Sequence, residues 1–333
     1  KVENGLRVIL DAGGDHPNGF EEILHGGIEA AKQGVPITFS CTKEQAQKVK
    51  RYTNNLDIDI LEARRVIPMN EEPSLRQLYE EFKDDNESSI VVAAKLAAET
   101  GWSIVTAGNR RAAISISVIA FDKLEKRVKP VLSGIVPSRR GVKEVVLCDM
   151  GAATFESVED YVNTGKLCVG EAKAVGRENP TVALLNIGTE PYKGKKEVYK
   201  ELSNSNLNFV GNVEPNKVII EGLADIVLVD GSIGNHVLKL FEGIAEYYID
   251  EIKEIANQNI AYKFFGWCAK KLMKKGTDPR KYSGALLLGV NGKIVNCHGE
   301  SDRVAIKYGV IRAWSYAQNK NIIKNQKEEL SKG

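Results

Sequence analysis

The sequence predicts an α/β protein in which a mainly parallel sheet is covered by helices in three α/β/α layers. Short apolar runs rich in β-branched residues alternate with longer amphipathic runs along the whole chain. The short runs are continuously apolar, which is typical of parallel strands buried on both faces. The chain has 333 residues, of which 43% are hydrophobic, so a single large core is within reach.

Seven runs are predicted as strands, and the amphipathic runs between them as helices. The predicted strands are residues 6–11, 37–41, 103–108, 144–151, 181–188, 226–231 and 286–296. The clearest predicted helices are residues 20–34, 88–101 and 196–204. No repeat or low-complexity linker divides the chain, so residues 1–333 are predicted to form a single domain. Two segments stand apart: residues 250–280 as an inserted basic amphipathic helical segment, and residues 319–333 as a frayed polar tail.

Composition excludes several classes of protein. The formal net charge of +2 gives no basis for nucleic-acid binding. The five cysteines are scattered without a CxxC pair, and no Cys/His cluster suggests a metal site. No GxGxxG follows the first strand and no Walker loop is present, so no cofactor is predicted. Reduced cysteines and the lack of a membrane span or signal pattern indicate a cytoplasmic protein.

Five of the predicted strands end in a glycine-containing polar turn. These turns are "DAGGD" from Asp11, "TAGNR" from Thr106, "CDMGA" from Cys148, "NIGTE" from Asn186 and "VDGSIGN" from Val229. Because the carboxyl ends of parallel strands form one edge of a sheet, we expect a ligand to bind where these turns meet. The alternative is that the glycines only close tight connections between strand and helix.

The polar residues of these turns favour acyl or phosphoryl transfer. Asparagine amides and turn N–H groups suit a developing oxyanion, and arginine and lysine suit phosphate. No Ser-His-Asp order and no activated cysteine is apparent, so the substrate itself would supply the nucleophile.

Four blocks of this sequence resemble the phosphate acyltransferase family known as PlsX. They are "LLNIGTEPYKG" (184–194), "NFVGNVE" (208–214), "DIVLVDGSIGNHVLKLFEG" (225–243) and "SGALLLGVNG…HGES" (283–301). The resemblance implies an isocitrate/isopropylmalate-dehydrogenase-like fold related to phosphotransacetylases. It also implies a homodimer that converts acyl-acyl-carrier-protein and inorganic phosphate into acyl phosphate for phospholipid synthesis.

Site residues follow as hypotheses from these blocks. The expected catalytic residues are Lys193, Asn235, Asn212, Asp230 and Lys239. The expected substrate- and phosphate-binding residues are Asp11, Gly13, Gly14, Asp15, Gly108, Asn109, Arg110, Asn186, Gly188, Glu190, Gly231 and Gly234. In this scheme the turn after Asp230 presents Asn235 and helix N–H groups to the oxyanion or the phosphate, and Lys193 neutralises the phosphate. Asp230 could instead be a turn cap without chemistry, and Lys239 a solvated residue or the partner of Glu242.

Residues 259–276 combine aromatic residues with five lysines and no acid. Such a helix is typical of contact with an anionic membrane surface or an acidic partner. The residues expected to make this contact are Lys263, Phe264, Phe265, Trp267, Lys270 and Lys271. The alternative is an amphipathic helix that packs on its own core.

Two rival functions stay open. One is a phosphotransacetylase-like enzyme that uses a short acyl thioester. The other is an inactive paralogue that binds the carrier protein or the membrane, because Arg110 and Arg111 stand where the family usually has a small pair.

Overall fold

The computed structural model describes residues 5–13, 19–84, 87–138, 144–155, 157–258 and 278–332, together with Tyr262, Gly266 and Cys268. These residues contain one sheet of 11 strands in the order β3-β2-β1-β4-β11-β10-β5-β6-β9-β7-β8. The strands are β1 (Val8–Asp11), β2 (Ile37–Thr42), β3 (Ile58–Ala63), β4 (Ser103–Thr106), β5 (Val131–Pro137), β6 (Glu144–Cys148), β7 (Val182–Leu185), β8 (Phe209–Val213), β9 (Ile226–Leu228), β10 (Ala285–Leu288) and β11 (Ile294–Asn296).

The sheet consists of two parallel halves that run in opposite directions. Strands β3, β2, β1, β4 and β11 are mutually parallel, as are β6, β9, β7 and β8. Between them, the pairs β11–β10, β10–β5 and β5–β6 are antiparallel. The expectation that all five glycine turns follow strands of one direction is therefore wrong, because three reversals turn the second half around.

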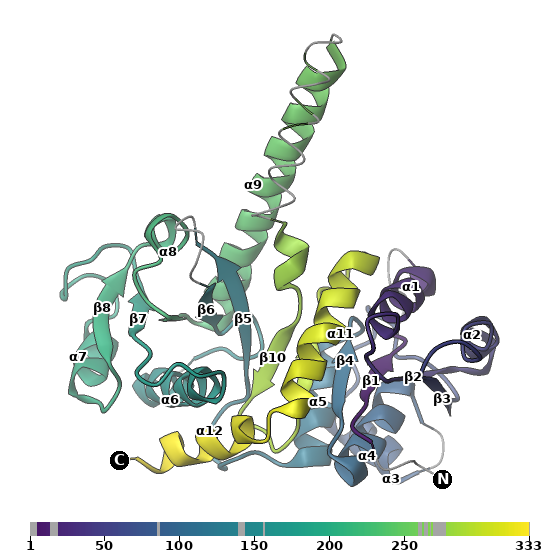
Figure 1. Ribbon diagram of the computed structural model, residues 1–333. Helices are drawn as coiled ribbons and strands as arrows, with labels where there is room; N and C mark the ends of the chain where they lie inside the picture. Colours follow the sequence, from purple (N-terminus) through teal and green to yellow (C-terminus); the bar gives the residue numbers. More distant parts are fainter. Residues whose placement is uncertain are drawn as a thin grey trace.

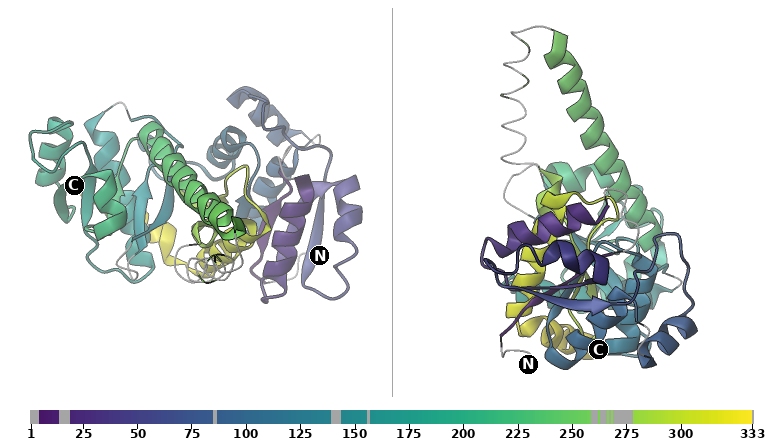
Figure 2. Two further views of the ribbon diagram at one scale, coloured as in Figure 1. Left: turned by 90° about the horizontal axis from the view of Figure 1, so that it is seen from above. Right: turned by 90° about the vertical axis from the view of Figure 1, so that its right-hand side faces the viewer.

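Helices cover both faces of this sheet, which confirms the predicted three layers (Figures 1 and 2). One face packs against α3 (Leu75–Lys83), α4 (Ser89–Thr100), α5 (Arg110–Phe121), α8 (Pro215–Glu221) and the start of α9 (Gly231–Gln258). The other face packs against α1 (Gly19–Ala31), α2 (Lys43–Val49), α6 (Val158–Ala174), α7 (Lys196–Asn204), α11 (Arg303–Gln318) and α12 (Asn321–Ser331). A short 3₁₀ helix, η1 (Pro279–Tyr282), precedes β10.

Successive strand residues belong to opposite cores, as the period of a strand requires. In β1, Val8 and Leu10 join one core and Ile9 joins the other, all three fully buried. The continuous apolar runs therefore predicted these strands correctly, because both faces of each strand need an apolar side chain.

Three strands were not predicted and one predicted run is two strands. Strands β3 and β8 lie at the two edges of the sheet and expose some side chains, which interrupts their apolar pattern. In β5 the pattern is broken by Gly134, where an added Cβ would lie 1.8 Å from Sδ of Met150. The run 286–296 folds back at Gly289, with φ +86°, into the antiparallel pair β10 and β11.

The chain end is a docked helix, so the prediction of a frayed tail at residues 319–333 is wrong. Helix α12 buries Ile322 and Leu330, and Glu329 forms an ion pair with Lys173 of α6 at 2.6 Å. Gln326 accepts a hydrogen bond from the main-chain N–H of Gly289 at 3.0 Å. The apolar positions of this helix are few and widely spaced, which is why the segment looked uniformly polar.

Helix α9 runs without a break through residue 250, where an inserted segment was expected to begin. Its first turns pack on the sheet, and the rest of the helix projects away from the body (Figures 1 and 2). Within the described part of the chain, no helix is long and apolar enough to cross a membrane.

Candidate active site

The first glycine turn is organised by the buried carboxylate of Asp11 at the end of β1. It accepts hydrogen bonds from the hydroxyls of Ser89 at 2.5 Å and Thr106 at 2.7 Å. Burial raises the pKa of Asp11, and the two hydroxyls offset this only in part. The predicted binding residue Asp11 thus ties together β1, β4 and the start of α4.

The turns after β1 and β4 touch each other. An added Cβ on Gly13 would lie 3.5 Å from the Cα of Gly108, and the N–H of Gly108 donates to Thr106 at 3.0 Å. Of the neighbouring predicted residues, Gly14 and Asp15 lie outside the described residues.

Asn109 is the N-cap of α5. Its Oδ1 accepts from the N–H of Ala112 at 3.0 Å, and its Nδ2 donates to the carbonyls of Pro68 at 2.9 Å and Glu71 at 2.7 Å. Both ends of this amide are therefore engaged within the protein, so Asn109 positions the first turn of α5.

The two halves of the molecule meet at Arg110. Its Nη1 donates to Oδ1 of Asn235 at 3.4 Å, and both side chains lie against Gly151, which follows β6. Arg111 points elsewhere and pairs with the exposed carboxylate of Glu72 at 2.8 Å. Arg110 and Asn235 are far apart in the sequence, and their contact brings the turn after β4 to the start of α9.

Two carboxylates shape the second half of the site. Asp149, fully buried after β6, accepts from the main-chain N–H groups of Leu132, Gly151, Ala152 and Ala153 at 2.6–3.1 Å. Burial raises the pKa of Asp149 despite these bonds.

Asp230, after β9, accepts from the N–H groups of Phe155 at 2.6 Å and Ser232 at 3.0 Å. Partial burial acts to raise the pKa of Asp230, but hydrogen bonds from backbone amides outweigh it and hold the pKa below its usual value. The N–H of Gly234 donates to the carbonyl of Asp230 at 2.7 Å.

These bonds change the expected role of the turn at Asp230. The N–H groups of Ser232 and Gly234 at the start of α9 donate to Asp230 itself, so they are not available to an oxyanion. In the described part of the chain, Nδ2 of Asn235 donates to no acceptor, so this amide is the available donor. Gly231 and Gly234 allow the start of α9 to approach the turn after β6 closely. An added Cβ on Gly231 would lie 2.2 Å from the carbonyl O of Ala153, and one on Gly234 would lie 1.9 Å from the carbonyl O of Asp149.

The loop after β7 is held by two buried asparagines. Nδ2 of Asn186 donates to Oδ1 of Asn212 at 3.2 Å and to the carbonyl of Lys193 at 3.1 Å, and Nδ2 of Asn212 donates to the carbonyl of Glu190 at 2.9 Å. Gly194, with φ +55°, is required because a Cβ there would lie 1.9 Å from Oδ1 of Asn186. Gly188 lies beneath the side chains of Glu190 and Lys193. The structure thus brings these predicted residues together.

The candidate lysines differ in their surroundings. Lys193 is exposed and places its ammonium 5.8 Å from the ring centre of Tyr192. Lys195, which was not predicted, places its ammonium 5.4 Å from the ring centre of Tyr161. Lys239 is exposed one turn beyond Asn235, and the side chain of Glu242 lies outside the described residues.

Tyr161 connects Lys195 to the turn at Asp230. Its ring packs edge-to-face on Phe155 at 4.8 Å, and the N–H of Phe155 donates to Asp230. Burial raises the pKa of Tyr161, and Lys195 offsets this in part. No spacing rule in the sequence links these residues, whereas Asp149 could have been found from its place in the "CDMGA" turn.

Other expected contacts cannot be placed. Lys263, Phe264, Phe265, Trp267, Lys270 and Lys271 all lie outside the described residues. The described residues contain no group of three His, Cys, Asp or Glu side chains that could hold a metal ion.

Comparison with known proteins identifies relatives over nearly the whole chain. The family described as "Fatty acid synthesis protein" matches residues 6–324. The phosphate acyltransferase of Halothermothrix orenii is 33% identical over 344 residues, covering 98% of this chain and 99% of the relative. That of Heliobacterium modesticaldum is 35% identical over 321 residues, covering 91% of each chain.

Solved structures share the fold at low identity. A phosphotransacetylase from Streptococcus pyogenes matches with a TM-score of 0.56 at 11% identity, covering 93% of this chain and 94% of that one. A 4-hydroxythreonine-4-phosphate dehydrogenase from Klebsiella pneumoniae matches with a TM-score of 0.54 at 14% identity, covering 94% and 100%. The fold is thus common to transferases and dehydrogenases, whereas the sequence relatives agree on one activity, and the chain belongs to the phosphate acyltransferase (PlsX) family of acyltransferases.

Proposed function

We propose that the protein transfers a fatty acyl group from acyl-acyl-carrier-protein to inorganic phosphate, giving acyl phosphate for phospholipid synthesis. The observation that carries the proposal is the contact between Arg110 and Asn235, a cation beside an amide whose Nδ2 has no acceptor among the described residues. A guanidinium suits phosphate because it offers several donors in a fixed plane, and an amide donor suits an oxyanion.

The reaction follows from these roles. A phosphate oxygen held by Arg110 attacks the thioester carbonyl, and the carbonyl oxygen becomes an oxyanion that Nδ2 of Asn235 stabilises. Collapse of the tetrahedral intermediate breaks the C–S bond and releases the carrier thiolate. Lys195, over Tyr161 and connected to the Asp230 turn, is a second cation for the phosphate beside Lys193.

The first test measures release of free carrier thiol from palmitoyl-acyl-carrier-protein, with and without phosphate, and traps the product with hydroxylamine. Phosphate-dependent release with a trappable acyl phosphate supports the proposal. Faster reaction with an acetyl thioester would favour the phosphotransacetylase-like alternative. Carrier binding without release would favour an inactive paralogue.

Two arginines provide a matched pair for the phosphate site. Arg110→Ala should raise the KM for phosphate by at least tenfold, because a charge-assisted bond to the anion is lost. Arg111→Ala, which removes a neighbouring cation paired with exposed Glu72, should leave that KM within about twofold. Equal effects of the two substitutions would remove Arg110 from the phosphate site.

For its location, we propose a cytoplasmic homodimer that attaches peripherally to an anionic membrane. Helix α9 exposes apolar side chains along its projecting part, including Leu240 (62% exposed), Ile244 and Tyr247. Such a row favours contact with lipid or with a second chain. Flotation with anionic and with zwitterionic vesicles tests membrane attachment, and the mass from light scattering tests dimer formation. Absence of vesicle binding or a monomer mass would contradict the corresponding part.

A further inference from the structure

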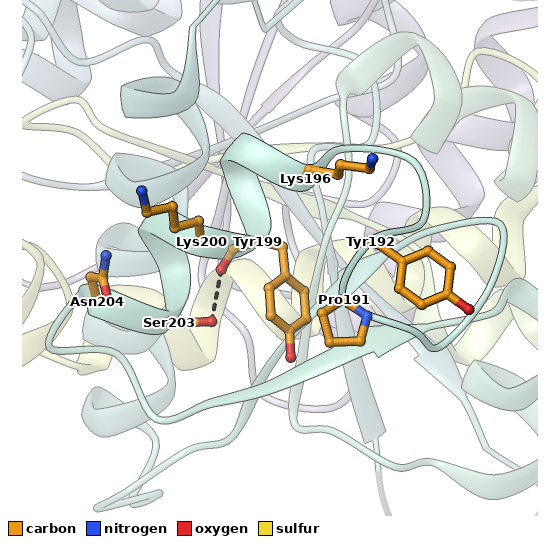
Figure 3. A pocket seen from close by; sticks show the side chains of 7 residues that line it. All are labelled: Pro191, Tyr192, Lys196, Tyr199, Lys200, Ser203 and Asn204. Carbon is orange, nitrogen blue, oxygen red and sulfur yellow. Dashed lines mark hydrogen bonds between the residues drawn. The ribbon is translucent and has the colours of Figure 1, made fainter.

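A groove lies on the outer surface of the second half, between the loop after β7 and helix α7. Its volume is about 380 Å³, and it is lined by Pro191, Tyr192, Lys196, Tyr199, Ser203 and neighbouring residues. In Figure 3, Pro191 lies between the rings of Tyr192 and Tyr199. The lining residues include lysines and no acid.

The floor of this groove is aromatic and fixed. The ring of Tyr199 packs edge-to-face on Phe209 of β8 at 5.2 Å, which holds its orientation. Tyr192 is 62% exposed and presents its ring to solvent. Aromatic side chains often anchor protein interfaces, because they offer a large area at a low cost in side-chain entropy.

The rim of the groove is positively charged. Lys196 and Lys200 are four residues apart on α7, so both ammonium groups lie on the same side of the helix. Both are exposed. Exposed cations around an apolar floor complement a surface on which carboxylates surround an apolar side chain.

The groove is joined to the candidate active site through one loop. Pro191 and Tyr192 belong to the segment whose carbonyls at Glu190 and Lys193 accept hydrogen bonds from Asn212 and Asn186. A partner seated on the groove would therefore contact the loop that Asn186 and Asn212 hold in place.

From these contacts we propose that the groove between Tyr192 and Lys200 is the docking site for the acidic carrier protein that delivers the acyl thioester. The proposal rests on the proposed function for the identity of the partner. The carrier's carboxylates pair with Lys196 and Lys200, and an apolar side chain between them packs on Tyr192 and Tyr199. A small anion is not favoured as the occupant, because exposed lysines alone hold one weakly.

The test compares the double reversal Lys196→Glu/Lys200→Glu with a control that has the same net charge, Lys32→Glu/Lys43→Glu. Lys32 and Lys43 are exposed and lie at α1 and α2, at the other end of the molecule from α7 (Figure 1). Affinity for labelled carrier protein is measured by fluorescence anisotropy without phosphate, and the KM for acyl-carrier is measured in turnover.

We expect the α7 reversal to weaken carrier binding and raise the carrier KM by about tenfold, with kcat and the phosphate KM unchanged. The difference should shrink at about 0.5 M salt, where charges are screened within a few ångströms. The control should stay within about twofold of wild type. Tyr192→Ala should weaken binding to a similar extent at both salt concentrations, since its contribution is apolar.

The outcomes separate this proposal from the proposed function. Equal carrier affinity of the α7 reversal and the control overturns the docking site, even if turnover is normal. Wild-type carrier binding that the reversal weakens, without any thiol release, supports the docking site and overturns the transfer reaction. If the reversal fails to fold by circular dichroism, Lys196→Gln/Lys200→Gln provides the same comparison with a smaller change.

Discussion

Asp149 and Asp230 follow two neighbouring parallel strands, β6 and β9, yet their environments shift their pKa values in opposite directions. Both accept hydrogen bonds from the short segment 151–155. Asp149 is fully buried, and burial raises its pKa although four backbone amides surround it. Asp230 lies nearer the surface, so its backbone hydrogen bonds dominate and lower its pKa.

The comparison shows that both carboxylates have a structural role, whatever the direction of their pKa shift. Both carboxylates are used to hold main-chain amides, which fixes the turns at the ends of β6 and β9. The amide of Asn235 and the guanidinium of Arg110 lie beside these turns and contact each other. We infer that the carboxylates position the site, and that the reaction depends on the groups they position.

The largest expected effect is that of Asp149→Asn on stability. The new amide group would point an N–H donor at the N–H groups of Ala152 and Ala153, and this buried mismatch should lower the free energy of unfolding by about 4 kcal/mol. Asp230→Asn should lower it by only about 1 kcal/mol, because the remaining amide oxygen still accepts from the N–H of Ser232 and the mismatch with the N–H of Phe155 lies nearer the surface. Urea denaturation at neutral pH measures both changes. Similar losses of unfolding free energy would show that the two carboxylates contribute equally to stability.

The next effect concerns the close approach between the two turns. Gly234→Ala should lower the free energy of unfolding by roughly 3 kcal/mol, because its Cβ would lie 1.9 Å from the carbonyl oxygen of Asp149. Gly243→Ala is the control on the same helix, with nothing within 4 Å of the added Cβ. It should raise stability by about 0.5–1 kcal/mol through helix propensity. Thermal denaturation of the pair checks this, and a tolerated Gly234→Ala would mean that the turns are free to separate.

Much of this framework could be predicted from the sequence. Continuous apolar strands such as β1 and β9 need no tertiary information, since each residue is buried on one of two covered faces. The reversal of direction between β11 and β6 could not be predicted, because it depends on pairing between distant strands. Helix α12 was missed because Ile322 and Leu330 are its main apolar contacts in an otherwise polar segment.

The sequence predicted which turns carry the site residues, but it did not predict which side chains contact one another. Asn186 and Asn212 were expected in the site, and they do hold one loop together. The pairing of Arg110 with Asn235 and the position of Lys195 over Tyr161 depend on side-chain direction, which spacing along the chain does not give. Asn109 and Arg110 are adjacent in sequence, yet one is used as a helix cap and the other reaches the second half of the sheet.

Substitution of Asn235 should affect the reaction rate far more than the stability, unlike substitution of Asp149. Asn235→Ala should lower kcat about a hundredfold, which is the usual loss for one oxyanion donor. Its free energy of unfolding should change by less than about 1 kcal/mol, because the one hydrogen bond that its side chain makes among the described residues, to Arg110, is long and partly exposed. Turnover of acyl-carrier at saturating phosphate gives the rate. A near-normal kcat would remove Asn235 from the mechanism and leave the site without its proposed oxyanion donor.

The smallest expected effect is a pH dependence of opposite sign at the two carboxylates. The pKa of Asp230 is lowered by folding, so its ionised form adds stability above about pH 4, the unfolded value, and this contribution is lost as the pH falls through the folded pKa. The pKa of Asp149 is raised, so its ionisation costs stability as the pH rises from about 4 toward the folded pKa.

Denaturation of wild type and Asp230→Asn between about pH 3 and pH 6 isolates the first contribution. The advantage of wild type should be about 1 kcal/mol at the upper end, and the part of it that depends on ionisation should be lost on acidification. Asp149 lowers stability as the pH rises above about 4, so it affects the upper part of both curves and cancels in the difference between the two proteins. If that difference stays constant down to pH 3, Asp230 titrates alike in the folded and unfolded chains, and the contrast between the carboxylates would then rest on burial alone.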